Sequence, residues 1–483
     1  MVQSAPTQVV SAQVEGRASA VTREDWATLL LLVAICFVFC WRAIVLNFFW
    51  WDDVSFLIEA NAGLRSLTMW HQGHFLPVFR LFMVAMWRTF GANYDAYQIV
   101  QLVIHASATW FLYLVMRRDS SQIVAVVFAL SYAVAPVVLP ELIILTMTSE
   151  ALMLLFFFAA LWCYERTVIS LLLLFLAFSS YGGGPVLVAP FGIYVAARSR
   201  RCLHPTALGA VALYVAFMRL RHHFIKFADY RPDVSAMRHP GVWWMGTMAG
   251  VRSAVKYMDV NAGVMIFAVI ILICIAWALF SARDKRSLWL VPAPVTLFIV
   301  YCTIAVAFRG FVERRHMYGA FVAVPWCASM LCGRLDVGFR KHRWAAATLG
   351  VSCILMLAFA WPSWQLTMDE KLIGTKMPGR EFTHDLEALT AAYSGPLFNT
   401  PLIPQINCHV TLQQFAPVVK LEGRSFVNDE FSTQPPFTWI YDPEKTQEHY
   451  THLNEWLESL PAEAESVRRF YRKYTPVHCP TSV

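Results

Sequence analysis

The chain has 483 residues, of which 58% are hydrophobic and 15% are charged, and its formal net charge at pH 7 is +7. A mean hydropathy of +0.50 excludes an ordinary soluble globular protein. Apolar stretches of about 20 residues recur along the chain, and each is long enough to cross roughly 30 Å of hydrocarbon. The composition therefore predicts a polytopic α-helical membrane protein.

The predicted membrane helices follow a polar N-terminal segment, residues 1–25, which has no apolar core of a signal peptide and is expected to be a cytosolic tail. Hydropathy predicts eleven spans after it, at 26–46, 95–116, 121–139, 149–164, 167–180, 185–197, 205–220, 262–281, 288–308, 316–333 and 344–362. The glycines of SYGGGP (180–185) indicate a flexible break, either a loop or a re-entrant turn. That segment lacks the lysine of a nucleotide-binding phosphate loop.

Basic loops predict the orientation of these spans. MRRD (116–119), ARSRRC (197–202), SARDKRS (281–287) and GRLDVGFRKHR (333–343) fall on one side, which the positive-inside rule places in the cytosol. The loop with Asp52 and Asp53, the loop 221–261 and the turn RGFVERRH (309–316) fall on the opposite side. Cytosolic loops explain the excess positive charge, so no nucleic-acid partner is expected.

The chain becomes polar from Ser363 on, with 15 acidic against 10 basic residues. Because the number of predicted spans is odd, residues 363–483 are expected on the side of Asp52, as a small non-cytosolic α/β domain. Strands are predicted in HVTLQQFAPVVKL (409–421), RSFVND (424–429) and FTWIYD (437–442), and helices in 443–460 and 461–474. Cys408 and Cys479 would be able to pair in an oxidising compartment, which the sequence leaves open.

The first outer loop, 47–94, holds an unusual set of polar residues. It opens with FFWWDD, and the candidate site residues in it are Asp52, Asp53, His71, His74 and Arg80. Residues 54–66 have the spacing of a helix that lies flat in the membrane interface. Acids with histidines and an arginine suit a reaction that needs a base and an anionic leaving group. The alternative is structural, since paired acids also mark the solvated end of a helix.

Two further groups of ionisable residues are predicted on the same side. FRGFVERRHMYGAF (308–321) contains the phosphate-binding candidates Arg309, Arg314, Arg315, His316 and Tyr318. Arginine offers a planar fork that fits phosphate oxygens, although a snorkelling interfacial turn has the same composition. Glu141 and Glu150 flank an apolar turn in VVLPELIILTMTSEAL. Acids at membrane depth are functional candidates, and ordinary solvation at a loop edge is the alternative.

The order of these motifs resembles the GT-C superfamily of integral-membrane glycosyltransferases, with the protein O-mannosyltransferase-like branch as the nearest resemblance. The matching motifs are the pair Asp52-Asp53, HFLPVFR (74–80), LPELIILTMTSEAL (139–152) and ERRHMYGAFVAVP (313–325), and together they cover about 26–330. The C-terminal domain is unlike the tetratricopeptide array of some relatives, so the acceptor stays open.

The resemblance implies a polyprenyl-phosphate sugar donor and transfer with inversion to an acceptor hydroxyl of a glycan, a lipid or a protein. Asp52 would be the general base, with Asp53 orienting the acceptor or helping to hold a divalent cation such as Mg or Mn near Asp52; the metal requirement stays open. Arg314 and Arg315, then Arg309 and Arg80, would bind the lipid phosphate. Glu141, His71, His74, His316 and Tyr318 complete the expected substrate-binding set.

Other functions and the cellular location stay open at this stage. An O-antigen ligase or polymerase also handles polyprenyl-linked glycans, and a non-catalytic membrane subunit of a larger complex would share the same composition. The outer domain has no N-x-S/T sequon. This favours a bacterial inner membrane, with the site and the C-terminal domain in the periplasm.

Overall fold

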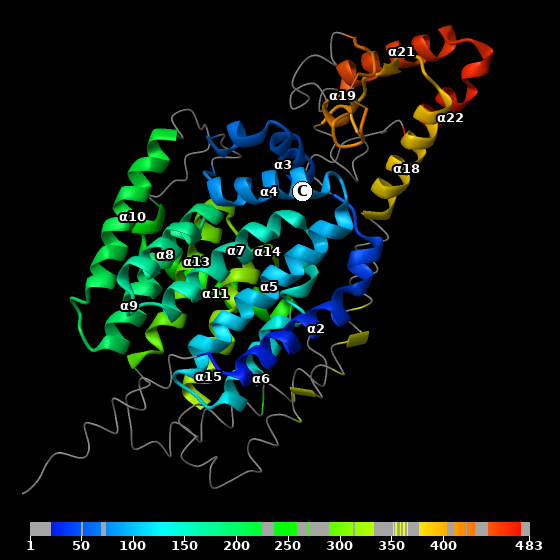
Figure 1. The fold of residues 1–483 in the computed structure, drawn as a ribbon. Helices are drawn as coiled ribbons and strands as arrows, with labels where there is room; N and C mark the ends of the chain where they lie inside the picture. Colours follow the sequence, from blue (N-terminus) through cyan, green and yellow to red (C-terminus); the bar gives the residue numbers. More distant parts are fainter. Residues whose placement is uncertain are drawn as a thin grey trace, which may run out of the picture. The chain divides into compact units, whose positions relative to one another are not determined.

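The computed structural model of the protein is mostly helical (Figure 1). It describes residues 21–49, 52–68, 74–224, 236–257, 269, 289–312, 314–332, 351, 353–354, 358, 361–362, 365, 376–402, 410–421, 423–429 and 443–474. These residues form 17 α-helices, short 3-10 turns and one two-stranded sheet. Two compact units are present: unit 1 comprises Met1–Phe39, Leu102–Glu141 and Glu150–Ser363, and unit 2 comprises Cys40–Gln101, Leu142–Ser149 and Trp364–Val483. Each is described by itself.

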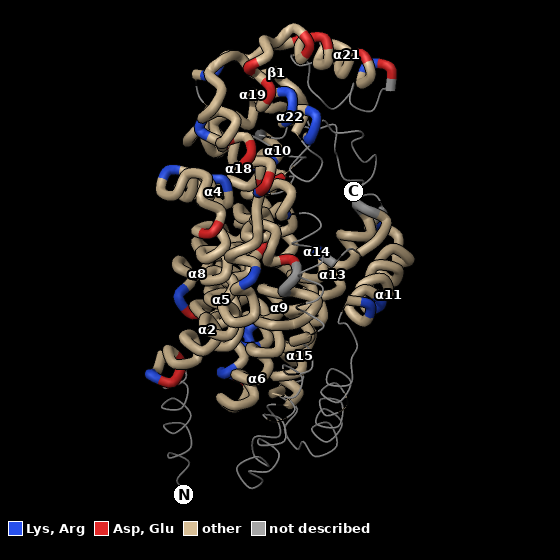
Figure 2. Tube along the Cα trace, turned by 90° about the vertical axis from the view of Figure 1, so that its right-hand side faces the viewer, with Lys and Arg blue, Asp and Glu red and all other residues tan. Residues whose placement is uncertain are grey.

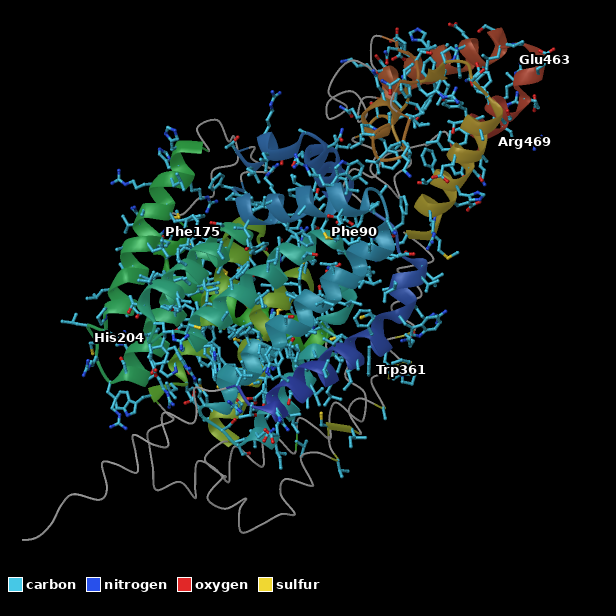
Figure 3. All side chains as sticks on the ribbon, viewed as in Figure 1. Phe90, Phe175, His204, Trp361, Glu463 and Arg469 are labelled. Atoms are coloured by element: carbon cyan, nitrogen blue, oxygen red, sulfur yellow. The ribbon has the colours of Figure 1, made fainter. Side chains whose placement is uncertain are left out.

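Unit 1 is built from apolar helices packed around α13. Its elements are most of α2 (Arg23–Leu46), the larger part of α5 (Tyr94–Arg117), α6 (Gln122–Ala133), α7 (Thr148–Trp162), α8 (Thr167–Ser180), η4 (Gly184–Leu187), α9 (Val188–Ser199), α10 (Pro205–Phe224), η5 (Ala236–Arg238), α11 (Pro240–Tyr257), α13 (Pro292–Arg309), α14 (Arg314–Phe321) and α15 (Ala323–Cys332). Helix α13 packs against α9, α11, α14 and α15. Aromatic rings join α8 to α10, because Phe175 (labelled in Figure 3) and Phe178 lie against Phe217.

Unit 2 combines the first predicted outer loop with the C-terminal segment. Its elements are the end of α2, α3 (Asp52–Asn61), η1 (Gly63–Thr68), α4 (Pro77–Phe90), the start of α5, η3 (Leu145–Met147), α18 (Met377–Ala392), β1 (Leu397–Phe398), α19 (Leu412–Phe415), β2 (Phe426–Val427), α21 (Pro443–Ser459), η9 (Ala462–Ala464) and α22 (Glu465–Tyr474). The 3-10 turn η2 (Leu139–Ile143) crosses the division between the units. Strands β1 and β2 are parallel, with Leu397 opposite Phe426 and Phe398 opposite Val427. Helix α3 packs against α4, η3 and α19.

Three helices in the described part of the chain are long and apolar enough to cross a membrane, which corrects the prediction of eleven spans. They are Arg23–Leu46, Tyr94–Arg117 and Leu145–Trp162. Three more apolar helices, Gln122–Ala133, Thr167–Ser180 and Pro292–Ala307, are shorter than the roughly 20 residues that a span requires. The predicted spans were too long because apolar residues continue through 3-10 turns and beyond helix ends, where the helix itself stops. Of the predicted spans, 262–281 and 344–362 lie mostly outside the described residues.

Helix α2 begins at Arg23, three residues before the predicted start, because its first turn is fixed by a buried acid. The carboxylate of Asp25 accepts a hydrogen bond from the backbone N–H of Thr22 at 2.7 Å, in the manner of a capping box. The same carboxylate, fully buried, also accepts from Tyr113 Oη at 2.7 Å and from Arg117 Nη1 at 2.6 Å. The carboxylate that caps the start of α2 therefore also bonds α2 to the end of α5.

The prediction that 221–261 is a loop is wrong for residues 240–257, which form α11. Gly246 and Gly250 lie four residues apart on the face of α11 that packs against α13. A Cβ at Gly246 would lie 2.5 Å from Thr303 Cα, and one at Gly250 would overlap Cys302 Sγ. The two backbones therefore approach closely only because both positions are glycine, which is the small-xxx-small pattern of packed helices.

Gly184 explains part of the SYGGGP segment. The chain makes a tight turn there, with Gly184 N–H donating to the carbonyl of Tyr181 at 2.8 Å, and continues as η4 and α9. A Cβ on Gly184 would lie 2.7 Å from the carbonyl oxygen of Ala177 in α8. The glycine thus permits η4 to pack directly on α8, and the segment is a packed turn in place of the flexible break expected from the sequence.

The C-terminal segment agrees in part with the prediction of a mixed α/β domain. The helices expected at 443–460 and 461–474 are present as α21 and α22, and a strand is present within 424–429. The strand predicted at 409–421 is wrong from Leu412 on, because Thr411 and Gln414 form a capping box that starts α19. At its start, Thr411 makes an isolated antiparallel bridge with Pro401. Charged residues are frequent on α18, α21 and α22, whereas α8 and α13 are almost free of them (Figure 2).

Candidate functional site

The two acids of the first outer loop start helix α3, where they differ in exposure. Asp52 and Asp53 form its first turn, a position where the partial positive charge of the helix N-terminus favours carboxylates. Asp53 is fully buried, whereas Asp52 is half-buried. The apolar face of α3, which includes Val54, Phe56 and Leu57, is also buried, so the orientation of α3 determines which acid turns inward.

Asp53 is held by two groups from distant parts of the chain. Its Oδ1 accepts a hydrogen bond from the backbone N–H of Thr146 in η3 at 2.9 Å. Its Oδ2 lies 3.7 Å from Nζ of Lys376, whose side chain is 1% exposed. Nζ of Lys376 also donates to the carbonyl oxygen of Phe48 at 3.0 Å. The buried carboxylate is therefore compensated by a buried ammonium group and by a backbone donor, as a buried charge requires.

A buried amide cluster lies just before the acids and fixes the end of α2 within unit 2. Asn47 Nδ2 donates to the carbonyl oxygen of Ile143 at 2.7 Å and to Gln98 Oε1 at 3.0 Å. Tyr94 Oη donates to the same Ile143 carbonyl at 3.1 Å, and Gln98 Nε2 donates to that of Leu142 at 2.9 Å. These contacts join the residue that follows α2 to the start of α5 and to the turn before α7.

Arg80 lies buried inside unit 2 and pairs with an acid of its own unit. Its Nη1 is 2.7 Å from Glu59 Oε2 and donates to the carbonyl oxygen of Ser66 at 3.0 Å. Its guanidinium carbon lies 5.5 Å from the centroid of the Phe56 ring. Burial lowers the pKa of Arg80, and the carboxylate of Glu59 opposes this shift. The expected role of Arg80 as a phosphate ligand stays a prediction, and the described contacts are those of a residue that joins α3, η1 and α4.

The other predicted residues of the first loop are less informative. His71 lies outside the described residues. His74 is half-buried and lies three residues before α4, which begins at Pro77 with the φ that a first helical position requires. Its proposed contact with a phosphate or a sugar hydroxyl stays a prediction.

The second group of candidates belongs to unit 1. Arg315, His316 and Tyr318 lie on α14, and Arg309 and Arg314 are described only through their backbone. Arg315 and His316 are half-buried. Tyr318 is fully buried, and its hydroxyl lies 2.7 Å from Nδ1 of His105. Since Nε2 of His105 lies 3.1 Å from the carbonyl oxygen of Ala133, the tautomer that donates there leaves Nδ1 to accept from Tyr318.

The two acids of the third group are both buried in unit 1. Glu141 is 3% exposed and lies in the 3-10 turn η2, and Glu150 is fully buried in the first turn of α7. Glu150 faces Gly319 of α14, where an added Cβ would lie 2.5 Å from its Oε1 and 2.7 Å from the hydroxyl of Tyr301. The alternative of ordinary solvation at a loop edge is thereby corrected, because neither side chain reaches water.

A divalent cation at the acid pair is not supported by the donor set. The ammonium group of Lys376 already supplies the positive charge beside Asp53 that a metal ion would bring. Among the residues that the structure describes, no three His, Cys, Asp or Glu side chains gather in a way that would hold a metal. We therefore derive no chemical step through a metal.

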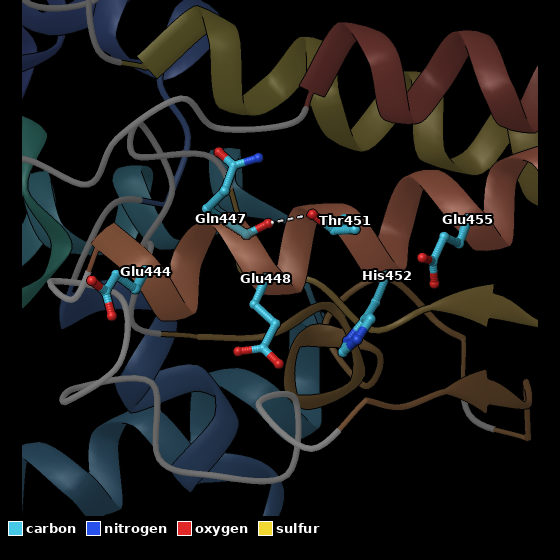
Figure 4. Close-up of a pocket in the computed structure, with 6 residues that line it drawn as sticks. All are labelled: Glu444, Gln447, Glu448, Thr451, His452 and Glu455. Atoms are coloured by element: carbon cyan, nitrogen blue, oxygen red, sulfur yellow. Dashed lines mark hydrogen bonds between the residues drawn. The ribbon is translucent and has the colours of Figure 1, made fainter.

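A pocket beside α21 is lined by Glu444, Gln447, Glu448, Thr451, His452 and Glu455 (Figure 4). All six residues come from one helix, and Thr451 Oγ1 donates only to the carbonyl of Gln447 one turn earlier. A row of acids on one helical face is the solvated side of an amphipathic helix. Because the lining comes from one side of a single helix, we assign this pocket no function.

Sequence reasoning missed Lys376 and α18, the helix that follows it. The local signal was available, because Pro378 stands at the start of α18 and Phe382, Leu386 and Leu389 have the spacing of one buried face. Nothing in the local sequence links Lys376 to Asp53. No protein-family model matches the chain, and no curated protein matches it. The GT-C resemblance therefore stays an expectation.

Proposed function

We propose that the protein is an inverting glycosyltransferase of the GT-C type, which moves a sugar from a polyprenyl-phosphate donor to an acceptor hydroxyl at the membrane surface. The observation that carries this proposal is the difference in exposure between the two acids at the start of α3. Asp53 is buried and compensated, and Asp52, its neighbour, is half-buried. A general base has to reach its substrate, and Asp52 is the acid of the pair that retains exposure.

The chemistry assigned to Asp52 is a single displacement. The carboxylate of Asp52 takes the proton of the acceptor hydroxyl while that oxygen forms a bond to the anomeric carbon. The bond between that carbon and the phosphate oxygen breaks, and the lipid phosphate leaves with the electron pair. Attack from the face opposite the leaving group inverts the anomeric carbon. The residues predicted from the sequence to stabilise charge on the phosphate stay Arg314 and Arg315, then Arg309 and Arg80.

The location follows from the same proposal. Three of the helices that the structure describes are long and apolar enough to cross a membrane, which suits a donor whose lipid tail stays in the bilayer. We assign the protein to a bacterial inner membrane, with Asp52 on the periplasmic side.

The substitution Asp52→Asn tests this function against a matched control, Asp95→Asn, which removes a half-buried acid from the first turn of α5. Membranes that contain each variant at equal amounts would be assayed for transfer from a synthetic polyprenyl-phosphate sugar, with the lipid phosphate product measured. Loss of a general base is expected to slow transfer about 10²- to 10⁴-fold, whereas Asp95→Asn leaves it within about two-fold. Equal rates for Asp52→Asn and the parent chain would refute the mechanism.

Mass spectrometry of lipid that copurifies with the protein tests the donor class independently. A bound isoprenoid phosphate or its sugar adduct is the expected result. The absence of any isoprenoid lipid, together with purification in fixed stoichiometry beside other chains, would instead favour a non-catalytic membrane subunit.

A further inference from the structure

We propose that Lys376 is the positioning residue of the acid pair, and that the C-terminal segment completes the site by placing this lysine against Asp53. The inference rests on the proposed glycosyl transfer and assigns a role to the C-terminal segment, which the sequence left open. Lys376 does not touch substrate in this scheme. It acts through Asp53 at the start of α3 and through the backbone carbonyl of Phe48.

The first support is the geometry of the contacts. Nζ of Lys376 bonds the carbonyl oxygen of Phe48 at 3.0 Å, four residues before Asp52, and lies 3.7 Å from Oδ2 of Asp53, directly after it. One ammonium group therefore ties both ends of the short segment that contains Asp52. The side chains of Lys376 and Asp53 are 1% and 0% exposed, so water does not screen the pair and the geometry is held by packing.

The second support is charge. Two adjacent carboxylates repel each other, and a buried one loses its hydration as well. A buried positive charge beside Asp53 offsets part of that penalty. With Lys376 absent, Asp53 loses this partner and is expected to rotate outward toward water. Rotation of Asp53 would turn the first residues of α3 and displace Asp52.

The third support is that other residues of the C-terminal segment also contact the chain between the end of α2 and α3. Arg380, one turn further along α18, donates to the carbonyl oxygen of Val45 at the end of α2. Helix α19 of the same C-terminal segment packs against α3. Three contacts from the C-terminal segment thus fall on the stretch from the end of α2 to α3, and Lys376 is the one that reaches the acids.

The test compares Lys376→Met, Asp53→Asn and their double variant in the full-length protein. Asn at position 53 keeps an oxygen for the N–H of Thr146, so the double variant removes the pair of charges together with the hydrogen bond from Lys376 to Phe48. Lys473→Met is the matched control, because Lys473 is a lysine of the same segment whose ion pair with Glu381 and Asp385 is exposed. Lys376→Arg keeps the charge and tests whether its exact placement matters.

Two readouts are needed. The first is the rate of transfer, separated into kcat and the KM for donor. Lys376→Met is expected to lower kcat about 10- to 100-fold with a change in KM below about three-fold, because a misplaced base slows the chemical step more than binding. The double variant is expected to recover at least about five-fold of that loss, and Lys473→Met to behave as the parent chain. A structural role alone would give no such recovery of kcat.

The second readout is the unfolding midpoint in detergent, which does not depend on any activity. Non-additive shifts for Lys376→Met and Asp53→Asn are expected, with the double variant more stable than Lys376→Met. If the parent chain transfers sugar and Lys376→Met does so equally well, the positioning role is refuted while the proposed function stands. In the other outcome, the parent chain transfers no sugar while the shifts in unfolding midpoint are non-additive. That result would refute both the proposed function and the positioning role, and would establish only that Lys376 and Asp53 form an ion pair.

Discussion

The ion pair of Arg80 and Glu59 gives the sharpest test of how a buried charge is used in unit 2. The guanidinium of Arg80 is 1% exposed, and the carboxylate of Glu59 is 24% exposed. Arg80 joins α4 to α3 through Glu59 and to η1 through the carbonyl oxygen of Ser66. A structural role predicts that the two residues depend on each other for stability, whereas a phosphate-binding role predicts that Arg80 matters to donor binding without Glu59.

The burial of each partner determines the expected magnitudes. Glu59→Gln removes the negative charge beside the buried guanidinium but keeps an amide oxygen that can accept a hydrogen bond. The loss is therefore expected near the low end for a broken buried pair, at about 3 kcal/mol, also because Glu59 is partly exposed. Arg80→Met keeps much of the aliphatic volume, and Glu59 can turn toward water, so the cost is about 1.5 kcal/mol. The double variant leaves no unpaired charge and is expected to lose about 1 kcal/mol. The coupling energy is then about 3.5 kcal/mol.

Unfolding of the four proteins in the same detergent, by denaturant or by heat, measures this cycle. Isothermal binding of a polyprenyl-phosphate lipid to each variant provides the second measurement. We expect the double variant to be more stable than Glu59→Gln and to bind the lipid as the parent chain does. Additive losses of stability would refute the structural reasoning. A double variant that folds well but fails to bind the lipid would establish Arg80 as a phosphate ligand.

Two further predictions concern other parts of the chain. Gly250→Leu is expected to destabilise unit 1 by more than about 2 kcal/mol, because its side chain would overlap Cys302 of α13, whereas Gly241→Leu on the same helix meets nothing within 4 Å and is expected to be tolerated in the same unfolding assay. Hydrogen bonds from Lys473 hold the pKa of Asp385 below its usual value of 3.8, so the stability from this contact is present above about pH 4 and is lost as the pH falls through the lowered folded-state pKa. Pepsin digestion between pH 5 and pH 2.5 should show cleavage near α18 and α22 increasing over that range, and an equal pH dependence in Lys473→Met would contradict the assignment.

Local sequence was sufficient for most of the helices. Apolar periodicity and end signals predicted the helices of 26–46, 95–116, 443–460 and 461–474 to within a few residues, because a helix depends on contacts three and four residues apart. The same reasoning failed at α11 and α19. Helix α11 carries charged and glycine positions that lower its hydropathy, and its identity as a packed helix depends on the surface that α13 offers to Gly246 and Gly250.

Span counting failed for a related reason. Hydropathy measures how apolar a stretch is, but the length of a helix is limited by where its backbone turns. The apolar residues after α6 and before α7 continue through the 3-10 turns η2 and η3, so each apolar stretch is longer than the helix that it contains. Burial inside a helical unit and exposure to lipid select the same residue types, and composition alone does not distinguish them.

The sequence by itself determined that this is a largely helical, apolar chain, and that an acid pair follows its first long apolar stretch. Only the tertiary structure decided which acid is buried, because that depends on the direction in which α3 turns its apolar face. Only the tertiary structure supplied the partner, since Lys376 bonds a carbonyl 328 positions earlier in the chain. Periodicity records neighbours along a helix, whereas a buried charge is compensated by whichever residue folding brings beside it.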